Sequence, residues 1–161
     1  MSKAFELSKE GAELVKKELT RYETKHSAII PALYQVQKEN GWVPPESIEY
    51  LAGLMGLPES HINEVFSFYT MFNKVPTGKL HVQVCTNISC SMNGGRELAK
   101  KLCERFNVKP GEVSKDGLVT ISQVECLGSC DTAPMMQVND RYIENLDFEK
   151  AVQALKEMGA Q

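Results

Sequence analysis

Four of the five cysteines in this 161-residue chain occur as two close pairs, and their spacing constrains the fold more than any other feature. Four residues separate Cys85 from Cys90, and three separate Cys126 from Cys130. Both pairs lie among small residues and glycines, in the stretches CTNISCSMNGG and ECLGSCDTA, which let a backbone approach closely. The sequence therefore predicts two loops that bring four thiols together.

Each cysteine pair follows a segment that is typical of a buried strand. The segment LHVQVC ends at Cys85, and the segment LVTISQVEC ends at Cys126. If these two strands are neighbours, both loops leave the same edge of the sheet. Four thiolates that converge from two loops would bind a metal centre.

The spacing favours a [2Fe–2S] cluster over the alternatives. Such a cluster is longer than a single ion, with two ligands on each iron, and accepts wide loops. Zinc also takes four thiolates, usually from tighter C-x2-C turns, and it stays open, as do a disulfide and unligated thiols. A catalytic dithiol is disfavoured because no C-x-x-C motif is present.

Composition and charge exclude several classes of protein. No apolar stretch approaches the roughly 20 residues of a membrane helix, and the charged N-terminus is unlike a signal peptide. We therefore expect a reducing compartment, where paired cysteines indicate metal or redox chemistry. The net charge of −3 and the absence of a basic run argue against nucleic-acid binding.

The first 75 residues contain no cysteine and predict a helical domain of four helices, over residues 7–23, 27–42, 48–54 and 57–69. In the first helix, Leu7, Leu14 and Leu19 form an apolar stripe, with Ser8 as the N-cap. Ser27 is the expected N-cap of the second helix.

Residues 76–161 predict a second domain with the order strand, helix, strand, hairpin, helix. The hairpin turns at Asn139 and Asp140, and Asp147 lies near the start of the last helix. This order resembles the thioredoxin fold. The fold class is therefore α+β, with an N-terminal helical bundle followed by a thioredoxin-like α/β domain.

The other reactive and aromatic side chains have simpler interpretations. Cys103 falls on the inward face of a helix and is expected to pack there. The aromatic run VFSFYTMF is expected to form a core seam between the two halves, with a docking surface as the alternative. We expect surface or structural roles for His26, His61 and His81. The acidic residues are expected to be solvated: Glu104, Glu125 and Asp131. The methionines beside the cysteine loops are expected to shield the cysteines from water: Met92, Met135 and Met136.

Two runs, FYTMF-x6-KLHVQVCTNISC and ECLGSCDTAPMMQVN, closely resemble the E-subunit family of NADH:quinone oxidoreductase, respiratory complex I. The resemblance extends over nearly the whole chain, including PALYQVQKENGWVP. It implies one [2Fe–2S] cluster on the thioredoxin-like domain, with Cys85, Cys90, Cys126 and Cys130 as its ligands. It assigns no catalytic residue to this chain.

The resemblance also implies a place in an assembly. In that family the subunit binds a flavoprotein subunit that carries FMN and the NADH site, and the helical domain would dock onto it. The chain has no G-x-G-x-x-G motif or P-loop and is not expected to bind NADH or flavin alone. We expect a cytoplasmic location, in the peripheral arm of a bacterial membrane complex.

Three alternatives stay open at this stage. One is the equivalent subunit of an NAD-linked hydrogenase or formate dehydrogenase. Another is a structural zinc module that serves only as an interaction domain. The third, a free-standing ferredoxin, would not need the 75 residues that precede the cysteine-containing domain.

Overall fold

The computed structural model describes residues 5–160, which form two compact units that divide between Pro76 and Thr77. No helix in the described part of the chain is both long and apolar enough to cross a membrane.

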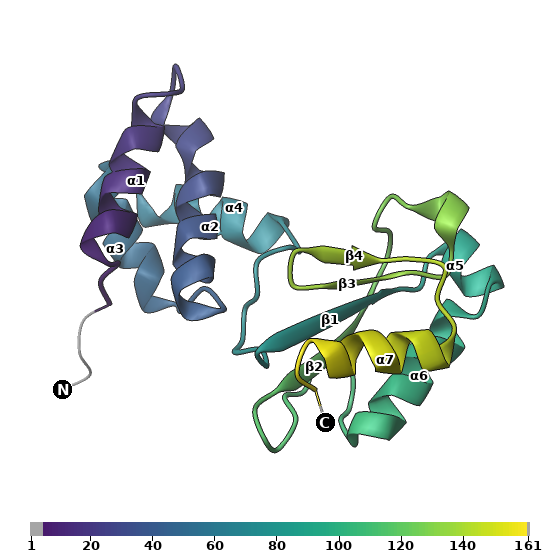
Figure 1. Ribbon diagram of the computed structural model, residues 1–161. Coiled ribbons are helices and arrows are strands. Elements are labelled where there is room, and N and C mark those ends of the chain that lie inside the picture. Colours follow the sequence, from purple (N-terminus) through teal and green to yellow (C-terminus); the bar gives the residue numbers. More distant parts are fainter. Residues whose placement is uncertain (1–4, 161) are drawn as a thin grey trace. The chain divides into compact units, whose positions relative to one another are not determined.

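The first unit is a helical bundle (Figure 1). Its elements are α1 (Lys9–Leu19), the 3-10 turn η1 (Lys25–Ala28), α2 (Ile29–Asn40), α3 (Glu46–Met55) and α4 (Glu59–Phe68). Fourteen buried side chains from these elements and their connections make one apolar core. The four predicted helices are therefore present, three with shorter bounds than predicted and α3 with longer ones.

Helix α1 begins as predicted but turns a different face to the core. The Ser8 side chain accepts a hydrogen bond from the backbone N–H of Gly11 at 2.9 Å, which makes Ser8 the N-cap. The predicted stripe is wrong at Leu14, which is exposed, because Gly11 and Val15 face the core instead. Gly11 lies against the ends of the Gln35 and Glu39 side chains of α2, which would have to move to admit a Cβ.

Helix α2 has no side-chain cap at its start, so the expected Ser27 cap is wrong. The turn η1 runs directly into α2, and the preceding turn supplies the first backbone partners of the helix. The Ser27 hydroxyl contacts that of Thr24 at 3.2 Å instead. The C-terminus follows the prediction, because Gly41 has a left-handed φ of 78°.

The second unit is a four-stranded mixed sheet with helices packed against it (Figure 1). The strand order is β2-β1-β3-β4, and only the β1–β2 pair is parallel. The elements are β1 (Leu80–Cys85), α5 (Ile88–Met92), α6 (Gly95–Phe106), β2 (Val119–Val124), the 3-10 turn η2 (Cys130–Thr132), β3 (Met136–Val138), β4 (Arg141–Ile143) and α7 (Phe148–Glu157).

The core of this unit lies between the sheet and helices α6 and α7. Leu80, Val82 and Val84 of β1 are buried in it, while the alternate residues His81 and Gln83 are half-buried. Because side chains alternate along a strand, Cys85 belongs to the face of His81 and Gln83 and leaves the main core. The Cys85 side chain instead joins a separate apolar cluster.

Candidate metal centre

The two cysteine loops follow two neighbouring parallel strands and start at the same edge of the sheet. Cys85 is the last residue of β1, and it pairs in register with Val124, the last residue of β2. Cys126 follows two residues later. Because the strands are parallel, the loops that follow them start side by side.

The first loop folds at once into the short helix α5, which carries Cys90. Asn87 caps this helix, and its side-chain oxygen accepts a hydrogen bond from the Ile88 N–H at 2.6 Å. At Gly95, the first residue of α6, an added Cβ would lie 2.6 Å from the Cys85 carbonyl oxygen and 2.8 Å from that of Cys90. Glycine at this position therefore lets α6 begin directly against the cysteine loop.

The second loop is held by groups on or next to β4. Gly128 has a left-handed φ of 82°, and its N–H donates to Cys126 Sγ at 3.4 Å. The Tyr142 hydroxyl donates to the Leu127 carbonyl oxygen at 2.7 Å. The hydroxyls of Ser129 and Thr132 both donate to the Glu144 carboxylate, and these bonds hold the pKa of that carboxyl below its usual value.

The two loops are also bonded to each other. The Ser89 hydroxyl donates to the Cys130 carbonyl oxygen at 2.9 Å, and the Cys85 thiol donates to the Glu125 carbonyl oxygen at 3.2 Å. Asn87 Nδ2 donates to Glu125 Oε2 at 3.3 Å. These three hydrogen bonds therefore hold the two cysteine loops together.

The four thiols differ in exposure. Cys85 and Cys90 are buried with Met135 in a small apolar cluster, whereas Cys126 and Cys130 are exposed. One side of the site thus lies against apolar protein and the other faces outward.

Burial and neighbouring thiols raise the pKa of two of the four cysteines. Burial raises the pKa of Cys90, and a hydrogen bond with the Cys85 thiol raises it further. The neighbouring charge of Cys126 raises the pKa of Cys130, and a hydrogen bond between their side chains adds to it. These effects disfavour the thiolate forms of Cys90 and Cys130 beside their neighbouring thiols. A bound cationic centre would compensate the negative charge of four converging thiolates.

This donor set fits a [2Fe–2S] cluster. Such a cluster takes four thiolates, two on each iron, and the structure brings Cys85 and Cys90 together in one apolar cluster and ties the loop of Cys130 to theirs. Among residues 5–160, no three His, Cys, Asp or Glu side chains are placed to hold one metal ion together. The Gly128 N–H supplies a donor to sulfur of the kind that tunes such centres.

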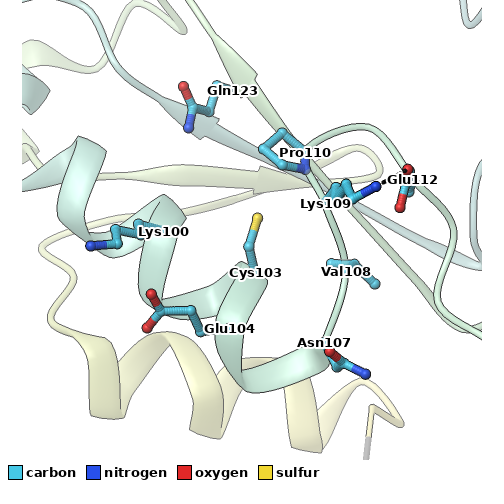
Figure 2. Close-up of a pocket in the computed structure, with 9 residues that line it drawn as sticks. All are labelled: Lys100, Cys103, Glu104, Asn107, Val108, Lys109, Pro110, Glu112 and Gln123. Atoms are coloured by element: carbon cyan, nitrogen blue, oxygen red, sulfur yellow. Dashed lines mark ion pairs between the residues drawn. The ribbon is translucent and has the colours of Figure 1, made fainter.

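Cys103 lies apart from the four paired thiols. Its side chain is 7% exposed in the main core of the second unit, and burial raises the pKa of its thiol. Figure 2 shows Cys103 on α6, pointing toward β2 from the floor of a surface pocket. Eight further residues line the pocket: Lys100, Glu104, Asn107, Val108, Lys109, Pro110, Glu112 and Gln123. The thiol has the packing role that the sequence predicts.

The flanking residues match their expected roles only in part. Met135 is fully buried beside Cys85 and Cys90, whereas Met136 belongs to the main core, and Met92 is 83% exposed. In the aromatic run, Phe72 is buried in the helical unit's own core, while Phe68 is exposed. The acidic residues Glu104, Glu125 and Asp131 are exposed.

Sequence reasoning missed the residues that hold the loops. Asn87 carried a detectable signal, because asparagine before a short polar run is a typical N-cap. No sequence signal connects Tyr142 or Glu144 with the second loop, since both contacts span 12 or more residues.

Three comparisons relate the chain to known proteins. The family model described as thioredoxin-like [2Fe–2S] ferredoxin matches residues 15–159. NADH-quinone oxidoreductase subunit 2 of Thermus thermophilus is 49% identical over 123 residues, which are 76% of this chain and 68% of that protein. The E subunit of the NADH-quinone oxidoreductase of Rickettsia bellii is 41% identical over 149 residues, covering 91% of this chain and 89% of the relative.

The solved structures show the same fold at lower identity. A NAD+-reducing [NiFe]-hydrogenase in the air-oxidized state superposes with a TM-score of 0.68 at 21% identity. The match covers 82% of this chain but only 23% of the hydrogenase chain.

Proposed function

Because the chain belongs to the family of thioredoxin-like [2Fe–2S] ferredoxins, we propose that Cys85, Cys90, Cys126 and Cys130 hold its cluster. The predicted family, fold and cofactor are confirmed. The predicted function, an electron-transfer subunit of NADH-quinone oxidoreductase, is confirmed through relatives that are subunits of this enzyme and match up to 98% of the chain.

The observation that carries the ligand assignment is the meeting of the two cysteine loops, which follow adjacent parallel strands and are joined by the Ser89–Cys130 and Cys85–Glu125 hydrogen bonds. When bound, the cluster would take up and release one electron at a time. Cys85, Cys90 and Met135 keep one side of the site free of water, and the Gly128 N–H stabilises negative charge on Cys126. The exposed pair, Cys126 and Cys130, faces the side from which a redox partner would approach.

The partner in this proposal is the flavoprotein subunit that binds FMN and NADH. The helical unit, Met1–Pro76, would dock onto it, and the assembly would lie in the peripheral arm on the cytoplasmic side. Electrons would then enter this chain from the flavin, and the chain by itself would hold no complete active site. The bacterial relatives, which are E subunits of NADH-quinone oxidoreductase, support this proposal.

A hydrogenase subunit is the related alternative. The likeness to the hydrogenase rests on the fold at 21% identity, whereas the quinone-reductase relatives share 41% identity over 91% of the chain. The sequence identity therefore favours NADH-quinone oxidoreductase as the parent complex.

The test is to purify the full chain without oxygen and to measure iron, zinc and acid-labile sulfide. Electron paramagnetic resonance is then recorded before and after reduction with dithionite. We expect two irons and two sulfides per chain, with a signal only after reduction. One zinc with no sulfide and no signal would overturn the proposal in favour of a zinc module. Co-purification with a flavoprotein tests the partner separately.

A further inference from the structure

Two histidines that are far apart in the sequence meet on the helical unit. His26 lies in η1 and His61 in the first turn of α4, 35 residues later. His26 Nε2 and His61 Nδ1 are 2.8 Å apart. The ring centroids are 4.8 Å apart, and the ring planes are inclined by 47°. Both residues belong to the same compact unit.

The distance between these two nitrogens is close to that of two ligands on one metal ion. With a Zn–N bond of about 2.0 to 2.1 Å, neighbouring nitrogen ligands lie about 3.0 to 3.4 Å apart. To admit an ion, the rings would separate by a few tenths of an ångström and rotate so that both lone pairs point at it. Each neutral imidazole can carry its proton on the ring nitrogen that faces away, which leaves the two facing nitrogens with free lone pairs.

The surroundings are open to an ion. His26 is exposed and His61 is half-buried, so water can reach the facing nitrogens. Lys25 precedes His26 in the sequence, and its ammonium group lies near Gly56. A Cβ added at Gly56 would be 3.1 Å from Lys25 Nζ. Gly56 ends α3, and a cation there is favoured by the helix dipole. Lys25 is thus engaged at a helix terminus.

We propose that His26 and His61 form a second metal site, for a late first-row divalent cation that favours imidazole, with Zn²⁺ as the ion tested. Within residues 5–160 no third side chain of the ligating types completes the pair, and we assign the other positions to water. The bound ion would tie η1 to α4 and would stabilise the helical unit by mass action. The site is independent of the cysteines and of the proposed electron transfer.

The test uses the full chain with its cluster in place, freed of loosely bound metal by gel filtration and kept without oxygen. Zn²⁺ is titrated by calorimetry, and iron is counted before and after. We expect one Zn²⁺ per chain with no loss of iron, and at least tenfold weaker binding in His26→Gln and in His61→Gln. His81→Gln is the matched control, because His81 is the third histidine and its ring contacts Ser122 in the other unit. This control should bind like the wild type.

Two further measurements test the proposal even if a variant fails to fold. Zn²⁺ should raise the melting temperature of the wild type and of His81→Gln, and leave that of the two other variants unchanged. X-ray absorption at the zinc edge of the wild type distinguishes nitrogen ligands at about 2.0 Å from sulfur ligands at about 2.3 Å. Sulfur ligands, equal binding in all four proteins or no binding at all would overturn the proposal and leave a simple hydrogen bond between the two rings.

Discussion

The Ser89 hydroxyl donates a hydrogen bond to the backbone carbonyl oxygen of Cys130 at 2.9 Å, and so joins one cysteine loop to the other. The two residues are 41 positions apart in the sequence. Ser89 precedes Cys90 on α5, so the bond links a backbone group of one proposed ligand to the neighbour of another. The relative position of the two thiol pairs therefore depends on a side chain that binds no metal itself.

Ser89→Ala should loosen this link without removing any ligand. A hydrogen bond of this kind contributes about 1 kcal/mol, so the cluster should still assemble but be lost about fivefold faster to an iron chelator. Bleaching of the visible spectrum measures that rate. Ser91→Ala, on the same helix, is the matched control, since no hydrogen bond from its hydroxyl to another described residue is present. Equal rates in the two variants would contradict the role given to Ser89.

Replacement of single cysteines tests the ligand set. Cys126→Ala or Cys130→Ala should abolish or strongly destabilise the cluster, because each removes one of four thiolates. Cys103→Ala should keep the spectrum and lose about 1 to 2 kcal/mol of stability from a small cavity in the core. Iron and sulfide content, with urea unfolding, measure both effects. The assignment is wrong if Cys103→Ala bleaches the protein while one of the other variants stays coloured.

Local sequence signals predicted those parts of the fold that local interactions determine. The cap at Ser8, the start of the last helix at Asp147 and the hairpin turn at Asn139 and Asp140 all appear at the predicted residues. The apolar segment that ends at Cys85 is a strand with the expected alternation. The place of each cysteine pair after a predicted strand was sufficient to predict that both loops start at one edge of the sheet. The prediction required only that the two strands be neighbours.

The misses have physical causes. The apolar pattern does not predict the buried face of α1, because Gly11 lies on that face and a glycine adds nothing to an apolar pattern. Helix α5 has five residues, too few for a period to be visible in the sequence. The contact between His26 and His61 depends on how η1 packs against α4, and no local pattern reports such a contact.

Gly95→Ala should disturb the first cysteine loop by overlap with its backbone. The new Cβ would lie 2.6 and 2.8 Å from the carbonyl oxygens of Cys85 and Cys90, so α6 or the loop must move. We expect a loss of about 1 to 3 kcal/mol in stability, as for overpacking in a core, together with reduced cluster content. Urea unfolding and iron analysis measure the two effects.

Gly53→Ala is the control for this substitution. Gly53 lies within α3, is exposed, and has nothing within 4 Å of an added Cβ. Alanine there should raise stability by up to about 1 kcal/mol through helix propensity. If both variants shift stability in the same direction, the steric explanation for Gly95 fails.

His81 should make the stability of the chain depend on pH. Burial lowers the pKa of this imidazole, whose Nε2 lies 2.9 Å from Ser122 Oγ. In the unfolded chain a histidine titrates near pH 6.5, about its ordinary value. At a pH between the lowered pKa of His81 in the folded chain and this ordinary value, the unfolded state binds more protons than the folded state. Stability is therefore complete above about pH 6.5 and falls as the pH decreases, by at most about 1.4 kcal/mol per pH unit.

His81→Gln removes the titrating group while keeping a polar side chain that can contact Ser122. Urea unfolding at about pH 7.5 and pH 5.5, on either side of the ordinary histidine value, should show a smaller loss of stability in the variant than in the wild type. His26 and His61 are present in both proteins, so their protonation cancels in the difference. A variant that loses as much stability as the wild type would show that His81 titrates normally in the folded chain.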